Sequence, residues 1–391
     1  MKTYDWIVVG AGITGVALAY ELAQQGLAVL LLEQHAVLQG STRYGYGGIA
    51  YWAGTTELTR QLCAAGIEWY RSRSEELPAT IEFRELDLIL TIASDTDPEP
   101  VAQFYQQYAI PPTLISVQAA CELEPLLYPQ SIGAALTVKH GHINLGALAA
   151  AYRQGFQQLG GEVAIAQVTG LHRPTVDHVA GVVCGQQTYV SDQVAICTGG
   201  LTRSLLKAVG IPVRIYFTHA ELIEMPSADV HLRSLVMPAV TQRFQLEASA
   251  STAELDHVWD QPGYEPAPPI LDAGAVQFLD GSLRVGQVSR TLTDPQAAID
   301  PVASEQAIRS QVGAILPALQ DLPGTWHHCL VAFSHDHLPL IGEIPGITGL
   351  QLFSGFSNPL AIVPPLAQRF AASAIGQEDE LLSLLSPARF S

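Results

Sequence analysis

The first 34 residues carry the pattern that most constrains the fold. Residues 6–9 form a short apolar run typical of a buried strand, and the glycines of a GxGxxG motif follow at positions 10, 12 and 15. Residues 16–25 are rich in Ala and Leu and predict a helix. Residues 29–32 predict a second buried strand, which closes with Glu33. This order of strand, glycines, helix, strand and acid predicts a βαβ unit that binds a dinucleotide.

Each part of this unit has a physical task. Gly10 makes a tight turn, Gly12 lets the backbone approach a pyrophosphate, and Gly15 lets the helix pack against the strand. The helix N-terminus directs N–H groups and a positive dipole end at the phosphates. Glu33, 18 positions after Gly15, has the spacing of a carboxylate that accepts ribose hydroxyls. We expect the neighbouring residues Ile13, Thr14 and Gln34 to contact the cofactor as well.

Length, charge and cysteine usage bound the remaining possibilities. The chain has 391 residues, more than the roughly 250–300 at which a single core stops growing, so two domains or one elaborated domain are expected. A formal charge of −18 disfavours nucleic acid and anionic membranes as partners. The five cysteines are never spaced CxxC, which disfavours a disulfide framework or a metal site and favours a reducing, cytoplasmic location. We find no signal peptide and no apolar run of ~18 residues, so no membrane span is expected.

Two later segments favour FAD over NAD. Residues 194–200 form an apolar strand that ends in Thr-Gly-Gly, so a nucleotide-binding domain is completed after a long insertion. Residues 350–369 predict a strand, a glycine-rich turn and a helix that begins near Pro359 or Leu360. The electropositive N-terminus of such a helix can stabilise negative charge on a reduced flavin ring.

At this point the chain resembles the glycine/D-amino-acid oxidase family of FAD-dependent oxidoreductases, which includes a sarcosine oxidase branch. The matching stretches occur in the order of the family and span nearly the whole chain. They are VVGAGITG at 8–15, Glu33, GSTRYGYGGI at 40–49, GHINLGALAAAYRQGFQQLGGEV at 141–163, the strand with TGG at 194–200, GSLRVGQ at 281–287 and DHLPLIGEIPGITGLQLFSGFS at 336–357.

The resemblance implies an α/β fold in which a Rossmann-type FAD-binding domain is interleaved with a second α+β substrate domain built on a mixed sheet. The FAD-binding domain would comprise residues 1–80, 140–205 and 326–391, and the substrate-binding domain residues 81–139 and 206–325. Local patterns predict strands of the second domain at 86–92, 215–225, 276–279 and 283–289. An acidic and then proline-rich segment at 247–269 is expected to be a surface excursion, with a lid over the site as the alternative.

The same resemblance implies which residues contact FAD beyond the N-terminal unit. Val168 would pair with adenine through its backbone. The other expected contacts are Ser41, Thr42, Arg43, Gly47, Gly48, Ile49, Thr198, Gly199, Gly200, Gly355, Phe356, Ser357, Asn358, Pro359 and Leu360.

Residues 327–342, HHCLVAFSHDHLPLIG, concentrate four histidines, a cysteine and an aspartate. Their spacing lacks the paired ligands of a structural zinc site, and no oxyanion signature surrounds the cysteine, so we predict neither a metal site nor a nucleophile. In the sarcosine oxidase branch, a cysteine seven residues before the aspartate that corresponds to Asp336 is bonded to the flavin. Cys329 stands at that spacing. The resemblance makes it a candidate covalent link, with an ordinary buried cysteine as the alternative.

The substrate pocket departs from the family pattern. The amino-acid oxidases of the family orient the substrate with an arginine that grips its carboxylate. In the glycine oxidase branch this arginine stands five residues before the position of Asp336, and here that position is Val331. We therefore expect an atypical pocket. Its candidate residues are Tyr46, His219, Arg290 and Asn358, for each of which a structural role is the alternative.

The expected function is oxidation of the C–N bond of a small amine or amino acid by hydride transfer to FAD. The enzyme would be an amine or amino-acid oxidase or dehydrogenase, with O₂ or a quinone as the electron acceptor. One alternative is oxidation of a C–O bond, as in a 2-hydroxy acid. A second alternative is a non-catalytic or maturation flavoprotein, which the absence of the arginine at Val331 suggests.

Overall fold

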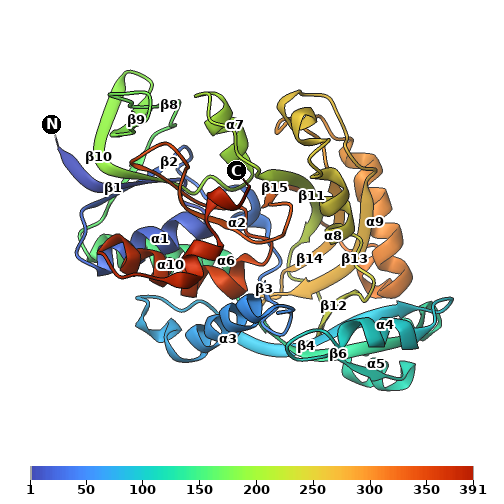
Figure 1. The fold of residues 1–391 in the computed structure, drawn as a ribbon. Coiled ribbons are helices and arrows are strands. Elements are labelled where there is room, and N and C mark those ends of the chain that lie inside the picture. The colour runs from blue at the N-terminus through green and yellow to red at the C-terminus, as the bar shows by residue number, and fades with distance from the viewer. Residues whose placement is uncertain (1, 391) are drawn as a thin grey trace.

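The computed structural model describes residues 2–390, which form two sheets packed side by side (Figure 1). The first sheet has the order β16-β17-β10-β1-β2-β7, with β9 paired to β10 and β8 paired to β9. Its strands are β1 (Thr3–Val9), β2 (Val29–Glu33), β7 (Glu162–Ile165), β8 (Gly170–Leu171), β9 (Gly181–Cys184), β10 (Gln187–Ile196), β16 (Leu340–Glu343) and β17 (Leu350–Ser354).

The second sheet has the order β15-β11-β14-β13-β12-β4-β6-β3, with β5 beside β6. Both parallel and antiparallel pairs occur in it, so it is a mixed sheet. Its strands are β3 (Gly48–Ile49), β4 (Arg84–Ala93), β5 (Thr113–Ile115), β6 (Ile132–His142), β11 (Tyr216–Met225), β12 (Leu235–Pro238), β13 (Ile270–Gln277), β14 (Leu283–Arg290) and β15 (Thr325–Phe333).

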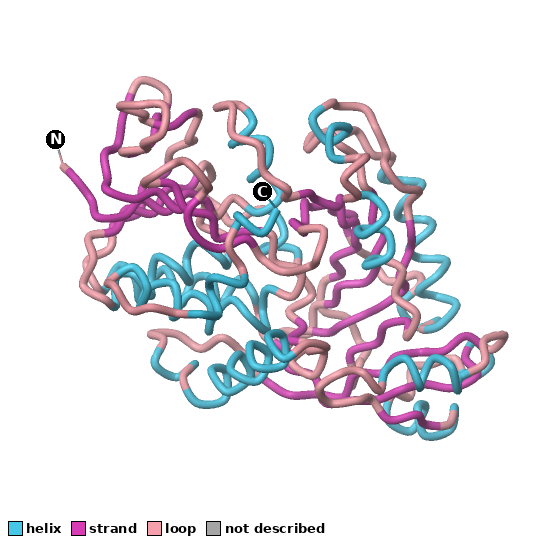
Figure 2. The backbone as a smooth tube through the Cα atoms, viewed as in Figure 1, coloured by secondary structure: helices cyan, strands magenta, loops and turns pink. Residues whose placement is uncertain are grey.

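The β1–α1–β2 unit forms as the sequence predicts. The strands β1 and β2 pair in parallel, and both are buried because helices cover the sheet. Helix α1 (Ile13–Gln24) begins three residues before the predicted start, since Gly12 already serves as its extended N-cap. It packs with α6 (Leu145–Gln158) and α10 (Pro359–Ala374), which lie together beside the strands in Figure 2.

Most predicted strands of the second sheet are present with shifted ends. Residues 86–92, 215–225 and 283–289 fall within β4, β11 and β14. The prediction at 276–279 captured only the end of β13, which begins at Ile270. Pairing with β14 extends β13 backwards through Ala273 and Gly274, whose small side chains carry little strand signal. Helix α9 (Pro301–Ile315) covers one face of this sheet.

Two segments that were assigned to the FAD-binding domain belong to the second sheet. Strand β15 pairs with β11 over nine positions, and β3 pairs with β6. The boundary predicted at residue 326 therefore falls inside a strand of the second sheet. The division into two interleaved domains stays a prediction, now with β15 as the segment that passes from one sheet to the other.

The remaining helices lie mostly in the excursions between strands. They are α2 (Gly40–Tyr44), α3 (Glu57–Ser72), α4 (Pro98–Tyr105), α5 (Val117–Leu123), α7 (Thr202–Lys207), α8 (Arg243–Ala250) and α11 (Glu380–Leu384). In the excursion at 247–269, the buried Arg203 of α7 binds Asp256 at 2.9 Å and Asp260 at 3.1 Å. These ion pairs fasten the excursion to α7.

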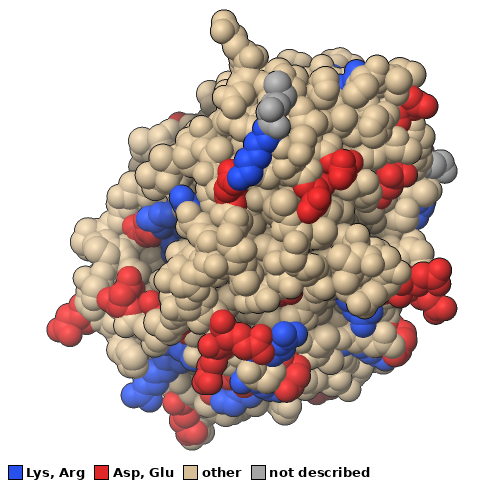
Figure 3. Space-filling view, turned by 90° about the vertical axis from the view of Figure 1, so that its left-hand side faces the viewer, with Lys and Arg blue, Asp and Glu red and all other residues tan. Residues whose placement is uncertain are grey.

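Charge is spread thinly over the surface. On the face drawn in Figure 3, Lys and Arg side chains stand next to Asp and Glu side chains, and most of the surface is uncharged. This face therefore presents no gathered basic area, in keeping with the net charge of −18. Within residues 2–390, none of the helices is both long and apolar enough to cross a bilayer.

Candidate active site

A cavity of about 1820 Å³ is lined by residues of both sheets. Its volume exceeds the roughly 300–1,000 Å³ of a typical small-molecule site. Glu33 of β2 and Val168, between β7 and β8, line it from the first sheet, and Gln287 and Val331 line it from the second. The cavity therefore has room for an extended dinucleotide together with a second, smaller molecule.

The glycine turn after β1 leaves no space for side chains. Gly10 has φ +99°, and a Cβ there would lie 2.7 Å from the carbonyl oxygen of Cys197. A Cβ on Gly15 would lie only 1.8 Å from the carbonyl oxygen of Gly10. The turn thus keeps the backbone of α1 close to β1 and β10, and it opens the first N–H groups of α1 towards the cavity.

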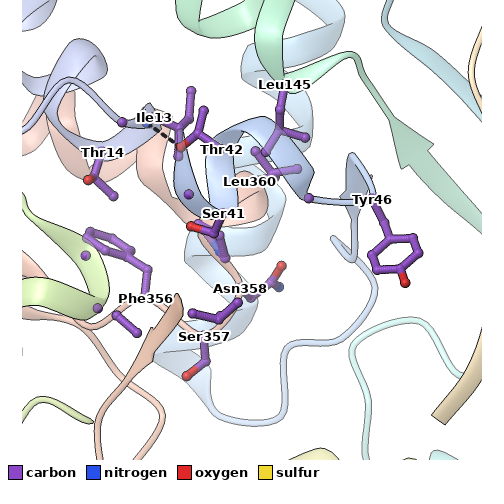
Figure 4. Close-up of a pocket in the computed structure, with 18 of the residues that line it drawn as sticks. Ile13, Thr14, Ser41, Thr42, Tyr46, Leu145, Phe356, Ser357, Asn358 and Leu360 are labelled. Atoms are coloured by element: carbon purple, nitrogen blue, oxygen red, sulfur yellow. Dashed lines mark hydrogen bonds between the residues drawn. The ribbon is translucent and has the colours of Figure 1, made fainter. Parts of the chain in front are cut away.

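The carboxylate of Glu33 is fixed where β2 ends. It accepts hydrogen bonds from the backbone N–H of Ala11 at 2.8 Å and of His35 at 3.1 Å. Each carboxylate oxygen carries more than one acceptor site, so Glu33 can bind a further donor from the cavity. Opposite it, the N–H of Ile13 donates to the Thr42 hydroxyl at 3.0 Å, which holds α2 against the start of α1 (Figure 4).

The turn between β17 and α10 forms the next part of the wall. In Figure 4, Ser357 and Asn358 lie across from Ser41. The Ser357 hydroxyl is buried and has no hydrogen-bond partner among the residues described. The Asn358 amide donates to the carbonyl of Ala50 at 3.3 Å, so its side chain fastens the turn to β3. The free N–H groups at the start of α10 lie at the same wall.

The second sheet faces the cavity with few polar groups near Val331. Val331 lies opposite Thr218 in the β11–β15 pair, so the two side chains share one face of the sheet. The hydroxyls of Thr218 and Tyr46 are both buried without a partner in the described structure. Burial raises the pKa of Tyr46, so its hydroxyl stays protonated and can donate a hydrogen bond.

His219 and Arg290 do not line the cavity. They pair with each other across β11 and β14, and Ile223 on the same face of β11 packs with Ile308 of α9. Arg290 binds the buried Glu221 at 2.7 Å, and His219 binds the carbonyl oxygen of Asp294 at 3.0 Å. The prediction that they form the substrate pocket is corrected, because strand alternation turns them towards α9.

Four predicted cofactor contacts also lie outside the cavity lining. Gly15 and Ile49 are packed beneath it. Arg43 forms a bidentate ion pair with Glu224 at 2.7 and 2.8 Å, which joins α2 to β11. Cys329 is buried, and burial raises the pKa of its thiol to about 12.

The cavity does bring the other predicted residues together. They come from segments far apart in the chain, between residues 10 and 360, as the family resemblance implied. These residues are Gly10, Gly12, Ile13, Thr14, Glu33, Gln34, Ser41, Thr42, Tyr46, Gly47, Gly48, Val168, Thr198, Gly199, Gly200, Gly355, Phe356, Ser357, Asn358, Pro359 and Leu360.

An aromatic wall of the cavity was missed by the sequence reasoning. Trp52 and Tyr108 meet edge to face at 5.3 Å, and Tyr105 and Tyr108 lie 5.2 Å apart. The Trp52 N–H donates to Nδ1 of His140 at 3.0 Å, so the neutral ring carries its proton on Nε2. Burial lowers the pKa of His140 to about 4. The sequence does show several aromatic residues at 104–108. It does not show that they pack beside Trp52 or that they face the cavity.

Arg243 was missed as well. It is the first residue of α8 and lines the cavity, and Arg153 is the other arginine in that lining. Arg153 stands on α6, which packs with α1 and α2 and contacts β7 of the first sheet. Arg243 follows β12 and lies at Asp272 of β13 in the second sheet. No local sequence motif marks an arginine in such a loop.

Comparisons with known proteins give one family and several similar chains. A family model described as "FAD dependent oxidoreductase" matches residues 5–373. The chain is 25% identical to the uncharacterized oxidoreductase YurR of Bacillus subtilis (strain 168), and the match covers 99% of each chain. A glycine oxidase structure from Geobacillus kaustophilus superposes with a TM-score of 0.78 at 19% identity, covering 100% of this chain and 99% of that one.

A further relative is more similar over a shorter stretch. The 4-methylaminobutanoate oxidase (formaldehyde-forming) of Paenarthrobacter nicotinovorans is 29% identical over 232 residues. The match covers 57% of this chain and 27% of that relative, so just over half of this chain aligns with about a quarter of the longer enzyme.

Proposed function

Because the chain belongs to the family of FAD-dependent oxidoreductases, we propose that it oxidises the C–N bond of a small amine or amino acid. The hydrogen on the carbon next to nitrogen leaves as a hydride, the nitrogen loses a proton, and water hydrolyses the resulting imine. Bound FAD supplies the hydride acceptor. The match to an amine-oxidising relative over more than half of this chain carries the choice of C–N over C–O chemistry.

The residues present fit FAD. The glycine turn at Gly10 and Gly12 keeps the backbone at the start of α1 free of side chains, and this helix start offers N–H groups and a positive dipole end to a pyrophosphate. Glu33 supplies a carboxylate for ribose hydroxyls. The orphaned Ser357 hydroxyl and the first N–H groups of α10 supply donors at the opposite wall. We propose that these groups hold the dinucleotide along the cavity.

The residues at the end of the cavity away from the nucleotide would orient the substrate and exclude water. The wall of Trp52, Tyr105 and Tyr108 is aromatic, and His140 beside it is neutral near pH 7 because burial lowers its pKa. Apolar walls favour the neutral amine, the form that can lose a hydride from its neighbouring carbon. We propose that Tyr46, whose buried hydroxyl lacks a partner in the described chain, hydrogen-bonds the substrate.

Anaerobic titration of the FAD-loaded protein tests this function. Amines, amino acids and N-methylated amino acids are added separately, and loss of the flavin absorbance is recorded by stopped flow. At least one nitrogen compound is expected to bleach the flavin within seconds, while matched 2-hydroxy acids leave it yellow. If the hydroxy acids bleach it and no amine does, C–O oxidation replaces the proposal. If neither class does so, the protein is a non-catalytic flavoprotein.

A further inference from the structure

Arg243 lines the cavity beside strand β13 of the second sheet. The family arginine is replaced by Val331, so β15 brings no cation to the cavity at that position. Arg243 enters the same cavity from the start of α8. The other arginine of the lining, Arg153, stands on α6, which packs with α1 at the nucleotide end of the cavity. The guanidinium of Arg243 is thus the arginine available beside the second sheet.

The guanidinium of Arg243 has donors to spare. Its Nε donates to Glu247 one helical turn later at 2.7 Å. Its Nη2 is buried and has no hydrogen-bond partner in the described structure. An arginine carries five N–H donors in a rigid fork, and leaving buried donors unpaired is costly. A ligand oxygen at this point would remove that cost.

The surroundings fix the direction of this side chain. Both carboxylate oxygens of Asp272 accept backbone N–H groups at the start of α8, from Gln242 at 3.0 Å and Arg243 at 3.3 Å. Glu247 is fully buried, and although burial raises its pKa, Arg243 and His337 together hold that pKa below the usual range. It is therefore ionised at neutral pH and holds the guanidinium by Nε. Glu247 and Asp272 act as positioning residues.

The cavity around Arg243 is suited to an apolar group as well as an anion. Three large apolar residues that line it, Phe104, Val240 and Phe244, are about half exposed to solvent. Phe104 packs edge to face against Tyr105 and Tyr108, which line the same cavity. Exposed apolar side chains that gather around a cavity mark a site for an apolar ligand.

We propose that Arg243 binds the carboxylate of an amino-acid substrate whose bulky apolar group packs against Tyr105 and Tyr108. This inference rests on the proposed amine oxidation and adds to it the substrate class and the residue that selects it. A fork with two free η nitrogens suits a carboxylate in a bidentate pair. A substrate as small as glycine would leave the aromatic wall uncovered.

Binding of two matched probes tests the proposal without turnover. Phenylacetate carries a carboxylate and an aromatic ring, and phenylacetamide keeps the shape without the charge. The FAD-loaded protein is titrated with each by calorimetry and by the shift of the flavin spectrum. Phenylacetate should bind roughly ten- to hundredfold tighter, the worth of a charge-assisted hydrogen bond. Acetate should bind more weakly than phenylacetate.

Four variants separate anion binding from stability. Arg243→Met should abolish the preference for phenylacetate, and Arg243→Lys should keep part of it. Glu247→Gln keeps an oxygen for Nε and removes a competing negative charge, so phenylacetate should bind at least as tightly. A purely structural role predicts a loss in both Arg243→Met and Glu247→Gln. Arg369→Met is the matched control, because Arg369 binds Asp379 and lies outside the cavity lining.

The outcomes distinguish this inference from the function beneath it. Equal affinity of the unmodified protein for the two probes, or an unchanged preference in Arg243→Met, would overturn the role of Arg243. If Arg243→Met does not fold, the probe affinities of Arg243→Lys, Glu247→Gln and the unmodified protein still test the role of Arg243. If amines bleach the flavin but the carboxylate preference is absent, only this inference fails. If no amine bleaches it, the proposed function itself fails.

Discussion

The two ends of the cavity are built in different ways. The nucleotide end consists mostly of backbone groups: glycines whose added Cβ would overlap a carbonyl, and helix N–H groups. One carboxylate, at the end of β2, adds to them. At the other end, side chains from distant segments meet, including Trp52, Tyr108, Arg243 and Val331. Backbone requirements leave a motif in the sequence, whereas a pocket made of side chains leaves none. The cofactor can therefore be predicted from the sequence, and the substrate cannot.

The largest effect is expected at the glycine turn. In Gly15→Ala the new methyl group would lie 1.8 Å from the carbonyl oxygen of Gly10, so α1 must move away from β1. We expect the free energy of unfolding to fall by about 3 kcal/mol or more, and the protein to lose FAD on purification. Chemical denaturation and the absorbance ratio of flavin to protein measure both. Gly170→Ala, with only ordinary contact to Val183, should change neither.

Glu33→Ala should have the next largest effect, confined to the nucleotide end. Loss of a carboxylate that accepts ribose hydroxyls should weaken FAD binding roughly ten- to hundredfold. Quenching of FAD fluorescence by the apoprotein measures the dissociation constant. The exposed Glu343 of β16 gives the control Glu343→Ala. If Glu33→Ala and the unmodified protein bind FAD with equal affinity, the Glu33 carboxylate does not contribute to FAD binding.

The ion pair between Arg43 of α2 and Glu224 of β11 is expected to give a smaller effect on stability, and this effect depends on pH. Hydrogen bonds from Arg43, opposed by burial, hold the pKa of Glu224 below its ordinary value. The pair therefore contributes stability above that ordinary value, roughly 4.3, and loses it as pH falls through the lower folded pKa. Glu224→Gln should cost about 1–2 kcal/mol at pH 6, and less at pH 3.5.

Urea unfolding of both proteins at the two pH values measures this difference. Glu305→Gln on α9 is a suitable control, since its pair with Arg309 is a single i,i+4 contact, worth about 0.3–0.5 kcal/mol. A cost for Glu224→Gln that grows towards acid pH would contradict the sign derived from the lowered pKa.

The smallest effect is expected at Cys329. Burial raises the pKa of this thiol to about 12, so it is protonated at neutral pH, and it lies outside the cavity lining. Because the thiolate is the nucleophile, we propose that FAD is held without a bond to this residue. Acid precipitation should release all yellow colour into the supernatant, from the unmodified protein and from Cys329→Ser alike. Colour that stays in the pellet only when Cys329 is present would establish the link instead.

The sequence was sufficient for the nucleotide-binding turns and for single strands in both sheets, and insufficient for the way the second sheet presents its side chains. The βαβ unit and the turn before α10 followed from glycines and apolar runs, which act locally. His219 and Arg290 were misplaced because their face of the strand depends on α9, more than one element away. Arg243 was missed because its role depends on where α8 docks. Sheet membership of β15 likewise depends on its partner β11, which lies about a hundred residues earlier in the chain.

The packing of α1 has a consequence for how the protein is made. Ten of the twelve residues of α1 are buried, and one of the helices that covers them is α10. Roughly 330 residues separate these two helices. At ribosomal rates of about 5–20 residues per second, about a quarter of a minute to a minute passes between the synthesis of α1 and that of α10. During that interval the side of α1 that packs against α10 is open, so we expect the nascent chain to depend on chaperones that shield this side until α10 emerges.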